Sequence, residues 1–215
     1  MNRRDFSAQL VGLGLGTAAL SAGLPAQAQG QPVEGTHYVR LGTPAPVNAP
    51  GKIEVIEFFW YGCPHCNAFE PALDAWQKKL PADVAFRRVP VAFREAFVPH
   101  QQIYYALEAM GKVEAMHRRV FYAIHNDRQR LEKPDEIAAF MEKNGIDKAK
   151  FLEVYNSFSV QTKSKQATRL AEAYKIDGVP ALGINGRFFT SGTLAGSMEK
   201  ALQITEYLIQ TQRKG

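Results

Sequence analysis

The clearest pattern in this chain lies between residues 53 and 91, where strand and helix periodicities follow one another. Residues 53–60 are almost wholly apolar and β-branched or aromatic, as in a strand that is buried on both faces. Apolar side chains at helical spacing then predict a helix from Pro64 to about Leu80, and residues 84–91 predict a second strand. A strand, a helix and a strand in this order indicate a crossover unit, with its functional loop at the carboxyl end of the first strand.

The middle third of the chain, from about residue 99 to residue 174, shows only helical periodicity. Pro134 stands where the first turn of a helix accepts proline, and Asp147 is suited to cap another helix by accepting a backbone N–H. A long helix over about residues 159–174 closes this segment. We therefore predict an all-helical segment without strands.

Strand character returns near the end of the chain. Two apolar runs, residues 181–184 and 187–190, are separated by Asn-Gly, which is a strong signal for a tight hairpin. A last helix is predicted over about residues 197–210. The Pro- and Gly-rich residues 31–51 predict an extended lead-in, with a short strand at about residues 38–41.

The N-terminus carries the features of an export signal. Arg3 and Arg4 precede an apolar stretch from residue 10 to residue 24, and Ala26-Gln27-Ala28 supplies a small-x-small cleavage site. We predict that residues 1–28 are a cleavable signal peptide. Because the apolar stretch is short and rich in Gly and Ala, an uncleaved membrane anchor is the weaker interpretation. The start of the chain also resembles the twin-arginine signal, but the usual downstream Lys is missing, so the export route stays open.

Composition and charge are typical of a folded globular protein and argue against a nucleic-acid binder. Hydrophobic residues make up 46% of the sequence and charged residues 22%, which suits a chain with a sizeable core. The net charge of +5 is carried by scattered pairs such as Arg87-Arg88 and Arg118-Arg119. A nucleic-acid binder would present a dense basic stripe with aromatic residues beside it. We expect these basic pairs to lie on a solvated surface.

The only two cysteines lie three positions apart in the run Cys63-Pro64-His65-Cys66. Such a pair at the start of a helix can alternate between a disulfide and two thiols. The helix N-terminus stabilises a Cys63 thiolate through unpaired N–H groups and the helix dipole, while Cys66, one turn further, is shielded and acts as the resolving thiol. Pro64 suits the first helical turn, and the His65 imidazole can lower the pKa of Cys63 further. The pattern favours an oxidising pair.

Other uses of the two cysteines are weaker. A structural zinc site needs four ligands, and no second Cys or Cys-His pair has a suitable spacing. Haem attachment requires His directly after the second cysteine, where this chain has Asn67. An inert disulfide would close so short a loop that it would stabilise the fold little. We therefore expect a redox-active pair, with no metal and no cofactor.

The run Glu57-Phe58-Phe59-Trp60-Tyr61-Gly62-Cys63-Pro64-His65-Cys66, together with Val179-Pro180, closely resembles the DsbA family of thiol:disulfide interchange proteins. The resemblance covers nearly the whole mature chain. It implies an α/β fold, the thioredoxin fold, interrupted by an all-helical domain. Residues 29–97 and 161–215 would form the thioredoxin fold, and residues 98–160 the helical insertion domain.

The resemblance also implies roles for individual residues. Cys63 is expected to be the nucleophile and to pair with Cys66 in a redox-active disulfide. Pro180 matches a cis-proline that faces this disulfide, and Val179 before it offers backbone hydrogen bonds to a substrate peptide. The residues themselves give modest support, because this Val-Pro directly precedes a predicted strand and a cis X-Pro bond is a turn feature.

Glu57 lies within the predicted buried strand, so its carboxyl needs a partner or a raised pKa. The resemblance suggests an acid near Cys66 that relays protons. The alternative is a structural salt bridge with Arg87 or Arg88 on the neighbouring strand. Glu70 matches another family acid near the site, but a solvated helix position explains it equally well.

We expect the aromatic residues and histidines outside the motif to play lesser parts. Trp60 and Tyr61 can form an apolar rim for substrate peptides. The remaining histidines are expected at the surface or as caps rather than as ligands: His37, His100, His117 and His125.

Together these features predict a periplasmic oxidase that donates its Cys63–Cys66 disulfide to reduced exported proteins. The resemblance implies reoxidation by a quinone-linked membrane partner similar to DsbB, and we expect a monomer that binds no nucleic acid. The alternatives are a disulfide reductase or isomerase, a glutathione-dependent isomerase of similar fold, and a peptide-binding, chaperone-like module. A specialised paralogue such as DsbL also stays open.

Overall fold

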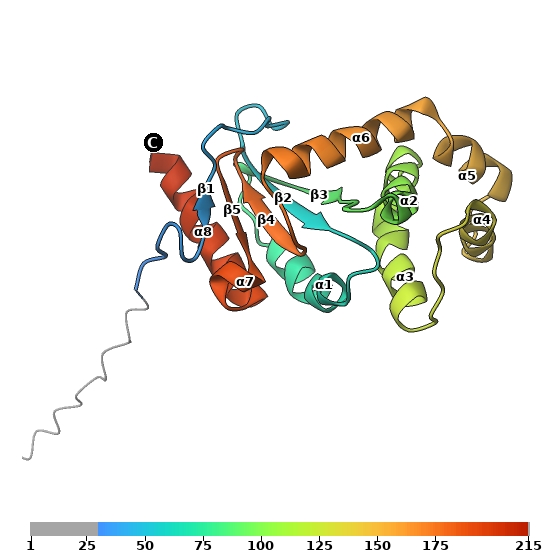
Figure 1. The fold of residues 1–215 in the computed structure, drawn as a ribbon, viewed down its shortest axis with the longest axis horizontal. Coiled ribbons are helices and arrows are strands. Elements are labelled where there is room, and N and C mark those ends of the chain that lie inside the picture. Colours follow the sequence, from blue (N-terminus) through green and yellow to red (C-terminus); the bar gives the residue numbers. More distant parts are fainter. Residues whose placement is uncertain (1–29, 215) are drawn as a thin grey trace, which may run out of the picture. The chain divides into compact units, whose positions relative to one another are not determined.

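The computed structural model describes residues 30–214, so the predicted signal peptide, residues 1–28, lies outside the described part. A five-stranded sheet crosses it (Figure 1), built from Val39–Arg40 (β1), Ile53–Phe59 (β2), Val84–Pro90 (β3), Ala181–Ile184 (β4) and Phe188–Ser191 (β5). The strand order is β1-β5-β4-β2-β3. Strand β2 pairs in parallel with β3, and the other neighbours are antiparallel. The two predicted strands at residues 53–60 and 84–91 are thus confirmed as a parallel pair.

Strand β2 lies inside the sheet, which explains why its sequence is apolar throughout. Its side chains are buried from Glu54 to Phe59. Val55 packs in a cluster with the apolar faces of α1 (Pro64–Gln77) and α8 (Met198–Lys214). On the other face Phe58 contacts Tyr174, at the end of α6 (Phe158–Ala173), with ring centroids 5.1 Å apart. Helices therefore cover both faces of the sheet, and the predicted strand–helix–strand crossover is confirmed.

The chain between β3 and β4 is helical, as predicted (Figure 1). Pro134 lies in the first turn of its helix, and the Asp147 carboxylate accepts the N–H of Lys150 over 2.7 Å as an N-cap. No helix within residues 30–214 is long and apolar enough to cross a membrane. Ahead of α6 this segment consists of Glu95–Phe97 (η1), Val98–Ala109 (α2), Val113–His125 (α3), Pro134–Lys143 (α4) and Lys148–Tyr155 (α5).

The predicted hairpin is confirmed and shows why its turn is Asn-Gly. Asn185 has φ 50° and Gly186 has φ 65°, the left-handed conformations that a two-residue hairpin turn requires. A Cβ at Gly186 would also come within 2.3 Å of the Ala45 carbonyl oxygen. The turn therefore needs glycine both for its backbone conformation and for space.

The structure differs from the sequence expectation at a few element ends. Helix α1 ends at Gln77 rather than near Leu80, because tighter turns precede Pro81: the N–H of Leu80 donates to the Gln77 carbonyl over 3.2 Å. Helix α8 continues beyond residue 210 to Lys214. Two short elements were not predicted, η1 and Gly192–Ala195 (α7), since a single turn is too short to show a periodicity.

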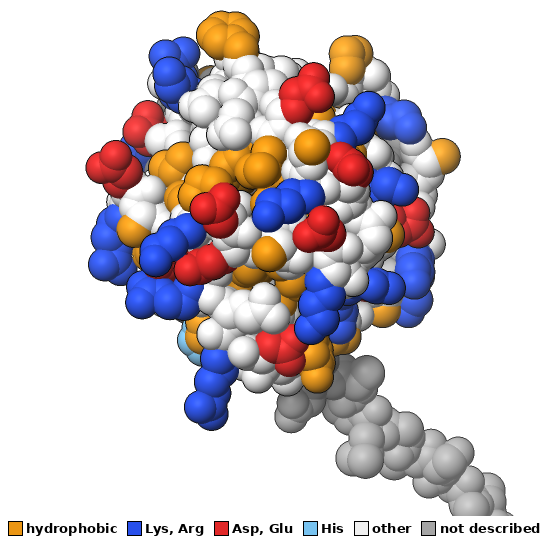
Figure 2. Space-filling view, turned by 90° about the vertical axis from the view of Figure 1, so that its right-hand side faces the viewer, with side chains coloured by type: hydrophobic (Ala, Val, Ile, Leu, Met, Phe, Trp, Pro, Cys, Tyr) orange, Lys and Arg blue, Asp and Glu red, His pale blue; other side chains and the backbone are white. Residues whose placement is uncertain are grey.

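Figure 2 shows the end of the molecule formed by the helical segment. Lys and Arg side chains alternate there with Asp and Glu around apolar side chains, and this face of the described residues carries no continuous basic stripe. The view agrees with the mild net charge of +5. This face is therefore unlike the dense basic surface with which proteins bind nucleic acid.

Candidate active site

The two cysteines lie at the start of α1, just after the carboxyl end of β2. Cys63 is the N-cap residue, Pro64 lies in the first turn, and the N–H of Cys66 donates to the Cys63 Sγ over 3.4 Å. Both are free thiols; Cys63 is 7% exposed and Cys66 is fully buried. The motif therefore has the helix position that its sequence predicted, and both sulfurs are buried, Cys63 slightly less completely than Cys66.

This geometry shifts the pKa values of the two thiols in opposite directions. A hydrogen bond from the Cys66 side chain lowers the pKa of Cys63 to about 6, against the opposing effect of burial. Hydrogen bonds from the backbone N–H groups of Cys66 and His65 lower the pKa of Cys63 further. The charge of the exposed His65 side chain lowers it least. Burial raises the pKa of Cys66 well above its usual range, with further contributions from Cys63 and Glu57. At neutral pH Cys63 is thus a thiolate and Cys66 a protected thiol.

The lowered pKa of Cys63 makes the stability of the dithiol form depend on pH. An unfolded cysteine titrates at about 8.5, whereas folded Cys63 titrates at about 6. The stabilisation by the Cys63 thiolate is therefore complete above the pKa of the unfolded cysteine. It is lost as the pH falls through the pKa of folded Cys63. We expect the free energy of unfolding of the reduced protein, relative to Cys63→Ser, to fall by up to about 3 kcal/mol across this range. Urea unfolding under reducing conditions measures it, and a difference that does not vary with pH contradicts a Cys63 thiolate.

A distant segment of the chain closes against the cysteines. The peptide bond between Val179 and Pro180 is cis, and the Val179 carbonyl oxygen accepts the Cys63 S–H over 3.4 Å. These partners are separated by 116 positions in the sequence. A cavity of about 640 Å³ opens beside them, lined by both residues of the cis peptide, by His65 and by apolar side chains that include Phe189, Leu194 and Met198. The fold thus brings the two predicted parts of the site together.

A buried ion-pair cluster joins β2, α1 and β3 next to this loop. Arg88 donates to Glu57 over 3.0 Å, to Glu70 over 3.2 Å and to Asp74 over 2.9 Å. Burial, followed by the charge of Glu70, raises the pKa of Glu57 well above its usual range, although Arg88 opposes this. The second Glu57 oxygen, Oε1, has no hydrogen-bond partner among residues 30–214. Glu57 is therefore a buried carboxyl whose surroundings favour its protonated form.

The cluster answers the question of which arginine pairs with Glu57. Arg88 does so, while Arg87 pairs with Glu54 at 2.8 Å. Arg88 is only 11% exposed, so the expectation of a solvated surface pair is wrong for this residue. A proton relay through Glu57 remains a prediction, which its free Oε1 supports.

Glu70 and two histidines lie in the core, where the sequence interpretation did not place them. Glu70 is fully buried, and His100 and His117 are each 4% exposed, so the expectations of a solvated acid and of surface or capping histidines are wrong. His117 lies 2.8 Å from the Tyr61 hydroxyl and 3.2 Å from a Glu70 oxygen. A weak signal was present in the sequence, since His117 and Phe121 share the apolar face of α3 at a spacing of four.

Trp60 and Tyr61 have different surroundings, although both were expected at a substrate rim. Tyr61 is fully buried, which contradicts that expectation. Trp60 is partly exposed and stacks on Phe97 with ring centroids 3.8 Å apart. Its indole lies over Gly62, where a Cβ would come within 2.3 Å of the ring. Gly62 therefore lets the indole cover the loop that carries Cys63.

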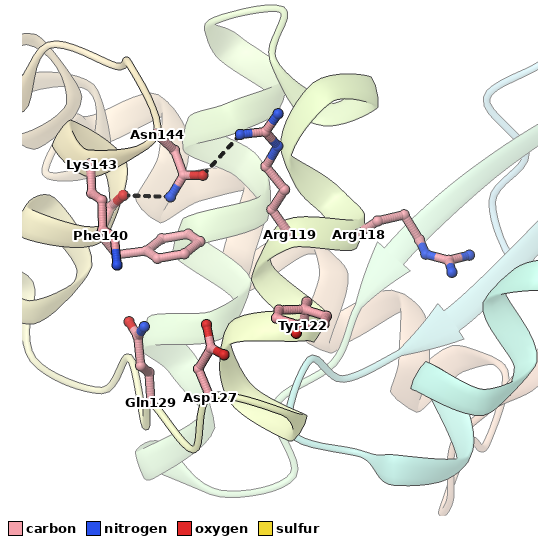
Figure 3. Close-up of a pocket in the computed structure, with 8 residues that line it drawn as sticks. All are labelled: Arg118, Arg119, Tyr122, Asp127, Gln129, Phe140, Lys143 and Asn144. Atoms are coloured by element: carbon pink, nitrogen blue, oxygen red, sulfur yellow. Dashed lines mark hydrogen bonds between the residues drawn. The ribbon is translucent and has the colours of Figure 1, made fainter.

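A separate cavity of about 460 Å³ lies on the helical segment (Figure 3). Arg119 on α3 donates there to the Asn144 side chain over 3.1 Å. None of the predicted site residues lines it; its lining is Arg118, Arg119, Tyr122, Asp127, Gln129, Phe140, Lys143 and Asn144. Within residues 30–214, no group of three or more His, Cys, Asp or Glu side chains is placed to hold a metal ion.

Comparison with known proteins points to one family. A family model described as the DSBA-like thioredoxin domain matches residues 54–203. The thiol:disulfide interchange protein DsbA of Azotobacter vinelandii is 48% identical over 83% of this chain and 84% of its own length. The DsbA of Bordetella pertussis is 44% identical over the full length of both chains. The crystal structure of Pseudomonas aeruginosa DsbA superposes with a TM-score of 0.82 at 45% identity, covering 85% of this chain and 95% of that one.

Proposed function

This chain belongs to the DsbA family of thiol:disulfide interchange proteins, and we propose that it works as an oxidase that donates a Cys63–Cys66 disulfide to reduced exported proteins. It is a protein disulfide oxidoreductase with a thioredoxin fold and a helical insertion. The observation that carries the oxidase direction is the unequal pair of thiols, a stabilised Cys63 thiolate beside a buried Cys66. Because a stabilised thiolate favours the dithiol form, the corresponding disulfide is a stronger oxidant.

In the first step a substrate thiolate attacks the Cys63 Sγ of the disulfide form. A bond forms between these two sulfurs, the Cys63–Cys66 bond breaks, and its electron pair passes to the Cys66 Sγ. Burial raises the pKa of Glu57 well above its usual range and so favours its protonated form, which suits it to protonate the leaving Cys66. The raised pKa of Cys66 then keeps that proton on sulfur.

In the second step another substrate thiolate attacks the substrate sulfur of the mixed disulfide. Cys63 leaves as a thiolate, and its lowered pKa makes it a good leaving group. The substrate has then lost two electrons and two protons. Solvent receives both substrate protons and returns one to Glu57, which replaces the proton now on Cys66.

The substrate peptide binds beside the disulfide, against Val179 and Pro180, in this proposal. In the dithiol form the Cys63 Sγ lies 3.4 Å from the Val179 carbonyl oxygen and donates to it when the sulfur is protonated; the disulfide form has no such donor. The carbonyl is then free to accept an N–H from an extended peptide. The neighbouring cavity of about 640 Å³ offers apolar side chains to the peptide's own side chains.

We place this reaction in the periplasm, reached through the N-terminal signal, and propose a monomer that a quinone-linked membrane oxidase similar to DsbB reoxidises. The proposal divides the mature chain into residues 29–97 and 161–215 for the thioredoxin fold and residues 98–160 for the helical insertion domain. The contact between His125 of α3 and the Tyr61 carbonyl oxygen, 2.8 Å long, supports a functional link between these parts.

A redox titration tests the proposed direction. The purified protein is equilibrated in glutathione buffers of graded potential, and the reduced fraction is read by alkylation of the free thiols. We expect a potential well above the value of about −270 mV typical of thioredoxin, together with a Cys63 thiolate absorbance that titrates at about pH 6. A potential near about −270 mV would overturn the oxidase role in favour of a reductase.

A further inference from the structure

Helix α3 holds the active-site loop through one residue, Tyr61. Three rings on the same side of this helix, His117, Phe121 and His125, surround it. The Tyr61 hydroxyl lies 2.8 Å from the His117 Nδ1, and the Tyr61 carbonyl oxygen lies 2.8 Å from the His125 Nε2. Phe121 packs against the Tyr61 ring with centroids 5.0 Å apart. Tyr61 stands two residues before Cys63. Helix α3 therefore contacts the loop that carries Cys63 through both the side chain and the backbone of Tyr61.

The direction of the hydrogen bonds at His117 follows from its surroundings. Burial raises the pKa of Tyr61 and lowers that of His117, so Tyr61 keeps its proton and donates it to Nδ1 of a neutral ring. The ring proton then lies on Nε2, which faces the Glu70 Oε1 at 3.2 Å. Nε2 and Oε1 are both buried, and neither makes a hydrogen bond of good geometry to any described residue. Each therefore still needs a partner, and each faces the other, an atom of opposite polarity, at 3.2 Å.

This contact gives unequal surroundings to Glu57 and Glu70, two buried carboxylates that share Arg88. Glu57 and Glu70 both bond to Arg88, and one cation cannot neutralise two buried carboxylates fully. Glu70 has His117 as well, whereas the Glu57 Oε1 has no hydrogen-bond partner among residues 30–214. Accordingly, burial raises the pKa of Glu57, while for Glu70 the opposing effect of burial is outweighed by His117 and Arg88 and the pKa is lowered.

We propose that His117 is a positioning residue for disulfide exchange: its Nε2–H keeps Glu70 ionised and thereby assigns the proton of the buried pair to Glu57. The inference rests on the proposed exchange reaction, in which Glu57 gives that proton to Cys66. It extends the active site to α3, a helix that contributes none of the reacting atoms.

The remaining charged and titratable groups around His117 are compatible with this assignment. Tyr104 of α2 lies with its ring 6.0 Å from the imidazole, and burial raises its pKa further above its usual range, so it stays neutral. Asp74 of α1 is 36% exposed and has Arg118 as a second cation at 3.5 Å. Asp74 therefore has solvent and a partner of its own, and the buried proton is left to Glu57 and Glu70.

Removing the imidazole tests the proposal. In protein with isotope-labelled glutamate side chains, nuclear magnetic resonance follows the protonation of each carboxyl, and Glu57→Gln and Glu70→Gln assign the two signals. We expect Glu70 to titrate well below Glu57 in the wild type. In His117→Leu we expect the Glu70 midpoint to rise by about one pH unit and the two midpoints to approach each other. The rate at which a dithiol peptide reduces the Cys63–Cys66 disulfide at neutral pH should fall by up to about tenfold.

Two further variants separate this effect from packing. His117→Gln keeps an acceptor for Tyr61 and a donor for Glu70, so it should restore both titrations. Phe121→Leu loses ring contacts in the same place but no hydrogen bond, so it should lower stability and leave the titrations unchanged. If His117→Leu does not fold, His117→Met fills the same space and equally lacks the N–H. Unchanged titrations in a folded His117 variant, or equal shifts in Phe121→Leu, overturn the proposal.

The carboxyl titrations need no substrate, so they can fail separately from the proposed function. A reducing potential combined with well-separated midpoints that merge in His117→Leu would overturn the oxidase role and support the role of His117. An oxidising potential, combined with carboxyl midpoints that do not change in His117→Leu, would support the oxidase role and overturn the role of His117.

Discussion

Replacing Cys63 by serine is expected to abolish disulfide transfer. A serine hydroxyl cannot form a disulfide, so no substrate sulfur can be attached and no electron pair can pass to Cys66. The fold should survive, because serine has a similar volume and is itself a preferred helix N-cap, the position that Cys63 occupies. The measurement is oxidation of a reduced substrate protein by the oxidised form, together with complementation of a strain that lacks its own oxidase. Undiminished function would mean that the sulfur is incidental and would favour the chaperone-like alternative.

Cys66→Ala provides the matched control, because it removes the other sulfur and leaves the nucleophile in place. Cys63 should still react with a disulfide such as oxidised glutathione, since its thiolate is stabilised partly by backbone N–H groups of the helix. The mixed disulfide should then accumulate, because no second thiol can resolve it. Mass spectrometry of the trapped adduct distinguishes the two variants. An adduct on neither variant would contradict the assignment of Cys63 as the attacking thiolate.

Replacing Arg88 by methionine is expected to lower the free energy of unfolding by about 3–5 kcal/mol at neutral pH. The loss would leave the fully buried Glu57 and Glu70 without the cation that now bonds to both. Both carboxyls would then need to be protonated in the folded state. When the pKa of a carboxyl is higher in the folded than in the unfolded state, the free energy of unfolding falls as the pH rises from the unfolded to the folded value. The destabilisation of Arg88→Met should therefore be smaller at mildly acidic pH. Denaturant unfolding at two pH values measures both effects.

Arg87→Met is the neighbouring control on the same strand. Arg87 is 31% exposed, and its partner Glu54 also accepts the N–H of Asn48 over 3.0 Å. Glu54 therefore keeps a hydrogen bond when the arginine is lost, and we expect a smaller destabilisation. Equal losses in the two variants would mean that the Arg88 cluster has no special place in the stability of the site.

Local sequence determined the elements of this protein and the chemistry at its centre. The hairpin at residues 181–191 follows from Asn185 and Gly186, whose backbone conformations are rare for other residues. The place of Cys63 at a helix start follows from Pro64 and the apolar spacing behind it. Each of these signals depends on residues within a few positions of one another, so periodicity and turn chemistry are sufficient to read them. The pairing of Val179 and Pro180 with the cysteines came from family resemblance instead.

Only the tertiary structure decided how the protons and charges of the site are shared. Glu57 had two possible arginines one position apart, and the parallel register of β2 and β3 selects Arg88. Nothing near Glu70 in the sequence shows that α3 packs against it and places His117 at 3.2 Å. Burial and hydrogen-bond partners depend on contacts between residues far apart in the chain, and these contacts set each pKa. The sequence by itself therefore identified the two sulfurs, while the fold decided which charged groups are buried together beside them.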